Sequence, residues 1–186
     1  MNKAHLEYCS SDEWADAVKR WIIPGAIEGI ELRDNVLEVG PGPGRTTEVL
    51  QHLTRRLTAV EIDEQLAAAL ARRLGSPSVR VVRGDGTKLP FADDRFTAAL
   101  SFTMLHHVPS VDAQDRLLAE VARVLQSGGV LAGSDSLDTP AWREMHIDDI
   151  CVPIDPQTLA GRLERAGFRD IRVEPNPYVV QFRATA

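Results

Sequence analysis

The residues best suited to chemistry lie between Val36 and Leu50, in the stretch VLEVGPGPGRTTEVL. An apolar run typical of a strand meets three glycines interleaved with two prolines, and a helix-like segment follows. Glycine lets the backbone reach positive φ and lets a ligand approach without an intervening Cβ, and Pro41 and Pro43 stiffen the turn. Three glycines in five residues at the start of a helix favour a ligand-binding loop over a tight turn without a ligand.

Two kinds of ligand compete for this loop. The dinucleotide fingerprint G-x-G-x-x-G places a pyrophosphate at a helix N-terminus. Here the glycines are residues 40, 42 and 44, and position 45 is Arg45, so the third glycine of that fingerprint is missing. The acidic Glu38, two residues before the loop, suits a positively charged ligand better than a phosphate. S-adenosylmethionine, whose sulfonium carries a positive charge, fits this pattern.

Two adjacent histidines, His106 and His107, are the candidate catalytic residues. Histidine titrates near neutral pH, and a general base is needed where the attacking atom must lose a proton. The alternative role for this pair is packing or contact with the edge of a cofactor. The remaining histidines have no partner nearby in the sequence and are expected at the surface or in packing: His5, His52 and His146.

Composition limits the class of protein. The 186 residues suffice for one domain with a full hydrophobic core. Lys and Arg number 21 and Asp and Glu 27, so the formal charge is 21 − 27 = −6, which discourages nucleic acid or an anionic membrane as the main partner. Cys9 and Cys151 fit no metal-ligand spacing, so no metal is predicted. Two cysteines do not make a disulfide scaffold either, so a cytoplasmic location is expected. The first residues lack the apolar core of a signal peptide.

Short apolar runs alternate with helical patterns along the chain. Apolar residues recur every fourth position in two segments, which indicates helices with one apolar face, and Gly75 and Gly128–Gly129 are expected to end them. A further helix is expected from Pro156, capped by Asp155, to Gly167. Strands are predicted at Val36–Val39, Leu57–Ile62, Val79–Val82, Thr97–Phe102, Val130–Gly133, Ile171–Glu174 and Tyr178–Phe182.

This alternation predicts an α/β fold, doubly wound and Rossmann-like, in which helices cover both faces of a mainly parallel sheet. The last two predicted strands are joined by a short turn, which suits antiparallel partners. Residues 1–35 stand apart as an N-terminal helical extension. Ser10 and Glu13 have the spacing of a capping box, and the helix that they begin either packs on the sheet edge or covers the ligand crevice as a lid.

Four motifs in succession carry a family resemblance. They read VLEVGPGPGRTTEVL, LTAVEID, VRGDGTKLPFADDRFTAALSF and TMLHHVPSVDAQDRLLAEVARVLQSGGVLAGSDS. Taken together and in this order, they resemble class I S-adenosylmethionine-dependent methyltransferases of the methyltransferase type 11 subfamily. The resemblance covers residues 36–186 and implies one methyltransferase domain there. It also implies a seven-stranded sheet of order 3-2-1-4-5-7-6 with strand seven antiparallel, S-adenosyl-L-methionine as cofactor and S-adenosyl-L-homocysteine as product.

The resemblance also assigns roles to residues by their places in these motifs. The backbone of Gly40–Gly44 would hold the methionine part of the cofactor, with Glu38 near its ammonium group. Glu61 would bind both ribose hydroxyls, as the corresponding acid does in dinucleotide folds. Ile62 would pack on the adenine face, and Asp85 would accept the adenine amine. The predicted cofactor-binding residues are Glu38, Gly40, Pro41, Gly42, Gly44, Thr46, Glu61, Ile62, Asp85, Gly86 and Ser101.

The methyl acceptor is predicted to be a small molecule, bound by a monomer or a homodimer. LEVGPGPG and AVEID are similar to segments of ribosomal RNA adenine dimethyltransferases. However, enzymes of this fold that methylate nucleic-acid amino groups carry an Asn/Asp-Pro-Pro-aromatic or Asn-Leu-Pro-aromatic tetrad after strand four, and this chain reads SFTM there, so a flipped adenine is not supported. An apolar cover for the acceptor, or else core filling, is expected from Tyr8, Trp14, Trp21 and Trp142.

Three alternatives to this function stay open on the sequence. The first is a domain that binds S-adenosylmethionine without catalysis, and the second is an RNA-modifying methyltransferase. The third is an NAD(P)-dependent oxidoreductase, which the missing third glycine and the proline-rich loop disfavour.

Overall fold

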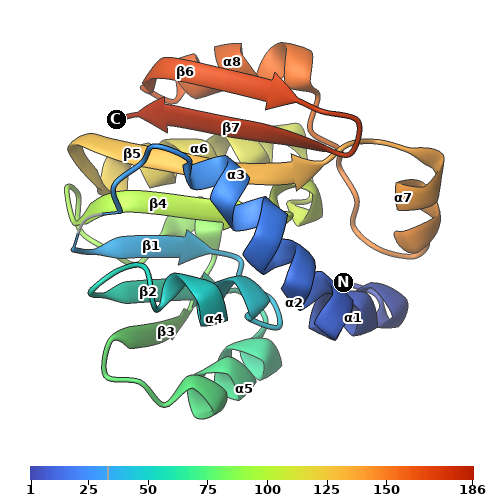
Figure 1. Cartoon of the computed structure of the whole chain (residues 1–186). Coiled ribbons are helices and arrows are strands. Elements are labelled where there is room, and N and C mark those ends of the chain that lie inside the picture. Colours follow the sequence, from blue (N-terminus) through green and yellow to red (C-terminus); the bar gives the residue numbers. More distant parts are fainter. Residues whose placement is uncertain (33) are drawn as a thin grey trace.

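The computed structural model describes residues 1–32 and 34–186 and contains one seven-stranded sheet (Figure 1). The strand order is β3-β2-β1-β4-β5-β7-β6. Strands β3, β2, β1, β4 and β5 are parallel neighbours, whereas β7 runs antiparallel between β5 and β6. The predicted fold class and strand order are confirmed. The strands are β1 (Val36–Val39), β2 (Leu57–Glu61), β3 (Val79–Arg83), β4 (Phe96–Phe102), β5 (Leu125–Ser136), β6 (Arg169–Pro175) and β7 (Val179–Thr185).

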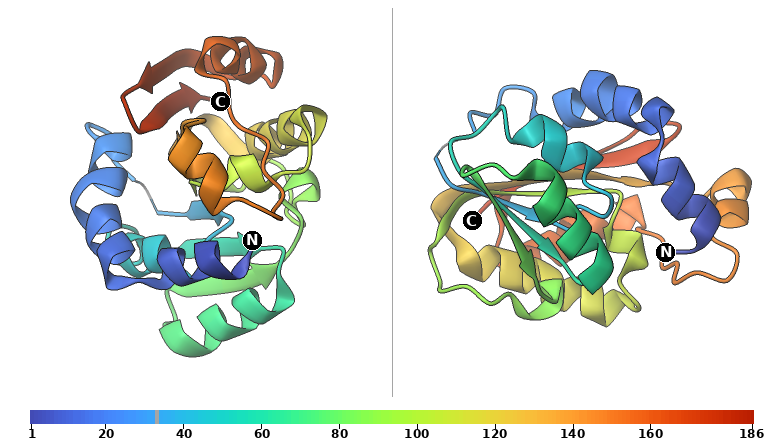
Figure 2. Two further views of the ribbon diagram at one scale, coloured as in Figure 1. Left: turned by 90° about the vertical axis from the view of Figure 1, so that its right-hand side faces the viewer. Right: turned by 90° about the horizontal axis from the view of Figure 1, so that it is seen from below.

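Helices cover both faces of this sheet, as Figures 1 and 2 show. Side chains of β1 alternate between the two faces, so Leu37 and Val39 belong to one buried cluster and Val36 belongs to the other. The first cluster includes apolar residues of α6 (Val111–Val124) and α8 (Pro156–Arg165). The second includes apolar residues of α3 (Ile23–Ile27) and α4 (Arg45–Leu50). The helices of the main domain are α4 (Arg45–Leu50), α5 (Glu64–Leu74), α6 (Val111–Val124), α7 (Pro140–Met145) and α8 (Pro156–Arg165).

The N-terminal segment forms more than the single helix that the sequence predicts. It contains α1 (Lys3–Ser10), α2 (Asp12–Ala17) and α3 (Ile23–Ile27), with a π-helical turn at Val18–Ile22. The predicted cap at Ser10 is wrong, because Ser10 ends α1 and Ser11 caps α2 by accepting the amide of Trp14. The π turn lies directly before Pro24, which lacks an amide donor and cannot continue an ordinary ladder of helical bonds.

The start of β5 also differs from the prediction. Helix α6 ends at Val124 and β5 begins at Leu125, so Gly128–Gly129 lies inside the strand and does not end the helix. The ladder between β4 and β5 shifts register between Phe96 and Ala98, and Gly128 adopts a φ of +77°. The early part of β5 is therefore irregular, which a run of glycines permits. Of the helices in the described ranges, none has the length and apolarity to cross a membrane.

Candidate active site

The glycine loop connects the carboxyl end of β1 to the start of α4. Gly40, Gly42 and Gly44 all adopt positive φ, at +71°, +53° and +87°, a region that side chains other than glycine rarely occupy. The amide of Gly40 donates to the carbonyl of Val60 on the neighbouring strand at 2.9 Å, and the amide of Gly44 donates to the carbonyl of Pro41 at 2.8 Å. The loop is thus a tight bend at the carboxyl ends of parallel strands, where open α/β sheets bind ligands.

Two methionine side chains lie above this loop. A Cβ added to Gly40 would stand 2.0 Å from Cγ of Met104, and one added to Gly42 would stand 3.6 Å from Cε of Met1. Both neighbours are flexible thioether side chains, which can move aside. The bare backbone of the loop is therefore covered by adaptable groups and not by a rigid wall.

Glu38 lies beside the loop as a buried acid with an unpartnered oxygen. Its side chain is 1% exposed, and the Thr46 hydroxyl donates to its Oε1. Its Oε2 has no hydrogen-bond partner within the described residues. Burial raises the pKa of Glu38 to about 7, against the lowering effect of the threonine hydroxyls. A cationic ligand group reaching this oxygen would both satisfy it and favour its charged form.

Glu61 ends β2 and is fixed by two backbone amides. Its Oε2 accepts from Gly42 and its Oε1 accepts from Asp63, both at 2.9 Å. Each carboxylate oxygen has a second lone pair for a ligand hydroxyl. Asp63, by contrast, caps α5. Ile62 lies between them and is 66% exposed, an unusual exposure for an isoleucine that follows a buried strand.

The third sequence motif, which follows β3, forms a turn of 3-10 helix at Gly86–Lys88. Asp85 caps this turn by accepting the amide and the hydroxyl of Thr87, each at 2.8 Å. A Cβ at Gly86 would stand 2.8 Å from Cδ1 of Leu117, so glycine here allows close packing against α6. Ser101, at the end of β4, is buried and its hydroxyl has no partner in the described part of the chain.

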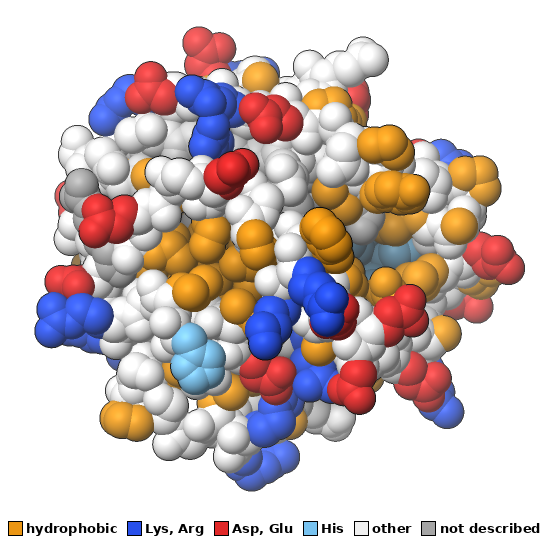
Figure 3. Space-filling view, viewed as in Figure 1, with side chains coloured by type: hydrophobic (Ala, Val, Ile, Leu, Met, Phe, Trp, Pro, Cys, Tyr) orange, Lys and Arg blue, Asp and Glu red, His pale blue; other side chains and the backbone are white. Residues whose placement is uncertain are grey.

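The histidines provide the largest departure from expectation. His106 is 1% exposed, and its ring lies within 6.0 Å of the ring centres of three other histidines, His5, His107 and His146. The expectation that His5 and His146 are isolated surface or packing residues is therefore incomplete, since both are buried in one cluster. His52 alone is exposed, away from this group. Figure 3 shows histidine surface set back among apolar side chains, on the side where α1 and α7 lie in Figure 1.

Comparison with known proteins agrees with this geometry. The family model "Methyltransferase domain" matches residues 37–133, which is more than half of the chain. The chain belongs to this methyltransferase domain family. The matched segment runs from β1 through the glycine loop, the carboxyl end of β2 and the end of β4 to β5.

Individual relatives of this methyltransferase domain differ in what they are named to act on. An "rRNA adenine N-6-methyltransferase" of Corynebacterium diphtheriae is 32% identical over 72% of this chain and 52% of its own length. A "Fatty-acid O-methyltransferase" of Mycolicibacterium smegmatis is 33% identical over 61% of this chain and 42% of its own length. The chain thus spans about half the length, or less, of these curated relatives. A "SAM dependent methyltransferase" of Aquifex aeolicus matches in structure with a TM-score of 0.73 at 20% identity, over 99% of this chain and 98% of that one.

The four aromatic residues that were expected to cover the acceptor do not form one group. Trp142 is buried against the histidines, with ring centres 5.1 Å from His106 and 4.4 Å from His146. Tyr8 and Trp14 pair with each other at 5.7 Å. The remaining one, Trp21, is 71% exposed. The expected apolar cover is therefore divided: Trp142 packs on the histidines, Tyr8 of α1 packs on Trp14 of α2, and Trp21 joins neither group.

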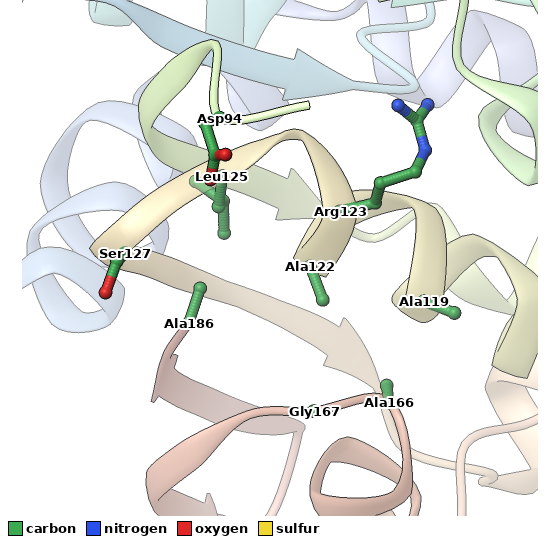
Figure 4. Close-up of a pocket in the computed structure, with 9 residues that line it drawn as sticks. All are labelled: Asp94, Ala119, Ala122, Arg123, Leu125, Ser127, Ala166, Gly167 and Ala186. Atoms are coloured by element: carbon green, nitrogen blue, oxygen red, sulfur yellow. The ribbon is translucent and has the colours of Figure 1, made fainter. Parts of the chain in front are cut away.

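A hollow of about 440 Å³ lies at the opposite end of the sheet (Figure 4). It is bordered by the start of β5, the end of α6 and the C-terminal residue Ala186. Its one cationic lining residue, Arg123, already bonds to Glu120 and Asp93. The hollow is far from the glycine loop, and its one cation is paired within the protein, so it is not the candidate active site.

Proposed function

We propose that this protein transfers a methyl group from S-adenosylmethionine to a small acceptor. The single observation that carries the proposal is the bare positive-φ loop beside a buried acid, Glu38, whose Oε2 has no partner in the described ranges. A pyrophosphate would be repelled by that acid, whereas the ammonium of an amino-acid moiety would pair with it. S-adenosylmethionine supplies a methyl group already activated by its sulfonium.

The residues of the three strand ends fit the rest of this cofactor. Glu61 offers two carboxylate oxygens, each held in place by one amide, for the two ribose hydroxyls. The exposed apolar side chain of Ile62 suits an adenine face. Asp85 stands one strand further along, and its Oδ1 holds the turn, while no hydrogen bond from the residues that the structure describes engages its Oδ2, which can accept an amine. Each role was predicted from a motif, and each stays a prediction that the geometry supports.

The N-terminal extension, residues 1–35, is proposed to act as a lid. Asn2 donates from its backbone to Asp149 at 2.8 Å, and from its side chain to the carbonyls of Met145 and Ile147 at 2.8 and 2.9 Å. Arg45 of α4 donates to the carbonyl of Ser10 at 2.6 Å. These contacts hold α1 beside α7 at the carboxyl end of the strands (Figure 2). Entry of the cofactor then requires Met1 and Met104 to turn away from the loop.

The acceptor is proposed to be small and at least partly apolar. Ile147 and Ile150 are exposed in the segment after α7, next to the contacts of Asn2, and give an apolar rim to the covered end of the sheet. The one aromatic residue in the SFTM stretch, Phe102, is buried in the core, so it is not available to stack on a flipped base. The net charge of −6 also disfavours RNA.

Chemistry at this site depends mainly on alignment. Holding the acceptor atom in line with the methyl group and excluding water supplies much of the rate in such a displacement. The ring of His106 is enclosed, while the His107 side chain is 18% exposed. Whether either acts as a base stays a prediction, and it applies to acceptors that must lose a proton.

The proposal is tested by turnover with a defined acceptor panel. Purified protein is given S-adenosylmethionine with fatty acids, hydroxylated aromatics or a ribosomal RNA fragment, and S-adenosylhomocysteine is measured. We expect turnover with a small acceptor. Product formed solely with RNA would favour an RNA-modifying methyltransferase instead, and cofactor binding without any turnover would favour a non-catalytic domain that binds S-adenosylmethionine.

A pair of surface variants tests the acceptor rim. Ile147→Asn should raise KM for the acceptor and leave cofactor affinity unchanged, because its side chain borders the covered end of the sheet. Leu53→Asn is the matched control: it is similarly exposed but lies between α4 and β2, at the other end. Equal effects of the two substitutions would contradict the placement of the acceptor.

A further inference from the structure

Four histidines converge at the carboxyl end of the sheet from three separate parts of the chain. His5 comes from α1, His106 and His107 from the turn after β4, and His146 from the residue after α7. One ring nitrogen from each lies within 4.8 Å of those of the others. Three are buried and His107 is half-buried.

The hydrogen bonds of three rings fix which nitrogen carries a proton. His146 Nδ1 lies 2.6 Å from the Trp142 carbonyl, and His107 Nδ1 lies 3.2 Å from the Ile150 carbonyl. A carbonyl can only accept, so Nδ1 must donate in both rings. His106 Nδ1 lies 2.5 Å from Oδ1 of the buried Asp135. In neutral rings, each Nε2 of these three histidines therefore presents a lone pair.

These lone pairs lack hydrogen-bond donors. Nε2 of His106 and Nε2 of His146 face each other at 3.1 Å, an arrangement that is repulsive unless a positive charge lies between them. Nε2 of His107 is buried without a hydrogen-bond partner in residues 1–32 and 34–186, and Nδ1 of His5 makes no hydrogen bond there, although the Asp149 carboxylate lies 3.7 Å away. Buried polar atoms in native proteins are nearly always satisfied.

We propose that His5, His106, His107 and His146 together bind one divalent transition-metal ion of the zinc class. Imidazole is a preferred ligand of such ions, and the second nitrogen of a ligating histidine usually donates to a carboxylate or a backbone carbonyl. Asp135, Ile150 and Trp142 supply those acceptors here. No metal is predicted from the sequence, where Cys9 and Cys151 fit no metal-ligand spacing. The four histidines are spread from residue 5 to residue 146 and form no short motif.

The distances and charges of the cluster fit this ion. Zn–N bonds of about 2.1 Å place two ligands at most about 4.2 Å apart, and about 3.4 Å apart in a tetrahedron. The His106–His146 separation of 3.1 Å is near the tetrahedral value, and the widest separation of 4.8 Å must contract by about 1.4 Å to reach it. Asp135 is buried beside the rings, and its charge favours a cation there. Asp149 also lies beside the rings, 3.7 Å from Nδ1 of His5, but it already pairs with the N-terminal ammonium of Met1 at 3.1 Å.

Burial favours the neutral form, which a metal ion needs, in three of the four rings. Burial, together with the neighbouring histidines, lowers the pKa of His5 to about 4. The same two causes lower the pKa of His107, and burial is the main cause that lowers the pKa of His146. Neutral imidazoles bind metal ions without first releasing a proton.

Four protein ligands make a closed tetrahedral site, which is typical of structural zinc. In such a site neither His106 nor His107 is free to act as a base, so this proposal replaces the catalytic role predicted for them. The ion would join α1 and the end of α7 to the turn after β4, and would hold the lid of the proposed active site in its closed position. Asn2 and Met145 already bring the same two helices together. A metal at this point therefore controls how easily the glycine loop opens.

The experiment measures zinc on the full chain without cofactor. Protein stripped with a chelator is incubated with Zn²⁺, dialysed and analysed for metal, and Co²⁺ is used as an optical probe. We expect one zinc per chain, a higher melting temperature and the intense visible bands of tetrahedral cobalt without a thiolate band. His5→Ala and His146→Ala should each weaken zinc affinity by at least tenfold, whereas His52→Ala, outside the cluster, and Cys151→Ser should not change it.

The result that overturns the proposal is equally specific. No zinc retained by the wild-type chain, or equal retention by wild type and His5→Ala, would overturn the four-histidine site. If a variant fails to fold, the cobalt spectrum of the wild-type chain decides alone, because octahedral bands or none would reject a four-histidine site. Cofactor binding is measured on the stripped protein as well, so failure of the metal site is distinguishable from failure of the proposed methyltransferase function.

Discussion

Replacing Glu38 with glutamine tests the role of the buried acid beside the glycine loop. Burial raises the pKa of Glu38 from 4.5 to about 7, so the folded protein favours its protonated form. Because the pKa is higher in the folded state, the contribution of the protonated Glu38 to the free energy of unfolding is fully present below pH 4.5 and is lost as pH rises towards 7. Glutamine keeps a neutral side chain of the same shape and removes the ionisation.

The size of the effect follows from that difference in pKa. A difference of about 2.5 corresponds to about 3 kcal/mol of folding free energy above pH 7, and to less than about 1 kcal/mol near pH 5. Between these two pH values, the stability advantage of Glu38→Gln over wild type should therefore grow by about 2 kcal/mol. The change with pH isolates the ionisation, because any packing defect of the amide is the same at both values.

Urea unfolding of both proteins near pH 5 and near pH 8 measures this quantity, without cofactor. We also expect Glu38→Gln to bind S-adenosylmethionine at least about tenfold more weakly, since the ammonium loses its carboxylate partner. A difference in stability that stays constant with pH would refute the reasoning. So would a variant that is more stable and still binds the cofactor as tightly as wild type.

Two further predictions concern the adenine face and the histidine cluster. Ile62→Ala should weaken cofactor binding by about 1 kcal/mol, roughly fivefold, through lost apolar contact, with unfolding unchanged because the side chain is exposed; calorimetric titration, with Leu53→Ala as control, checks it. Burial lowers the pKa of His5 from 6.5 to about 4. The contribution of the neutral His5 ring to the free energy of unfolding is therefore fully present above pH 6.5 and is lost as pH falls towards 4. In protein stripped of metal, urea midpoints should therefore fall across that range, and more steeply in wild type than in His5→Asn; parallel curves would exclude His5 as a source of the loss.

Much of the fold was predictable because its signals are local. Buried strands such as β1 and β2 are short apolar runs, and Pro156 after Asp155 marks the start of α8 by its fixed φ and missing donor. The antiparallel β7 followed from the short turn before it. The two errors in the fold prediction also have local causes. Ser10 and Ser11 are adjacent and either can cap a helix, and the structure uses Ser11. Gly128–Gly129 was expected to end a helix, but it lies within β5, which begins three residues earlier.

The candidate site divides in the same way. Glu38, Glu61 and the glycine loop are each tied to the end of a predicted strand, so the strand order brings them together, and the bond from Gly42 to Glu61 follows from it. The histidine cluster was not predictable, since His5 and His146 are 141 positions apart and meet only through the packing of α1 against α7. No periodicity encodes such a meeting. The side chains of Met1 and Met104 over the loop belong to the same class of tertiary contact.

The central claim is that the bare bend at Gly42 receives S-adenosylmethionine, and calorimetric titration of two glycine variants tests it most directly. Gly42→Ala and Gly75→Ala both place a Cβ at a φ near +50°, at +53° and +48°, and each meets little or nothing in the protein. Each should therefore cost a similar strain of about 1 kcal/mol. The account predicts that one S-adenosylmethionine binds per chain in wild type and Gly75→Ala, that NAD does not bind, and that Gly42→Ala loses cofactor binding. Undiminished binding by Gly42→Ala, or binding of NAD alone, would contradict it.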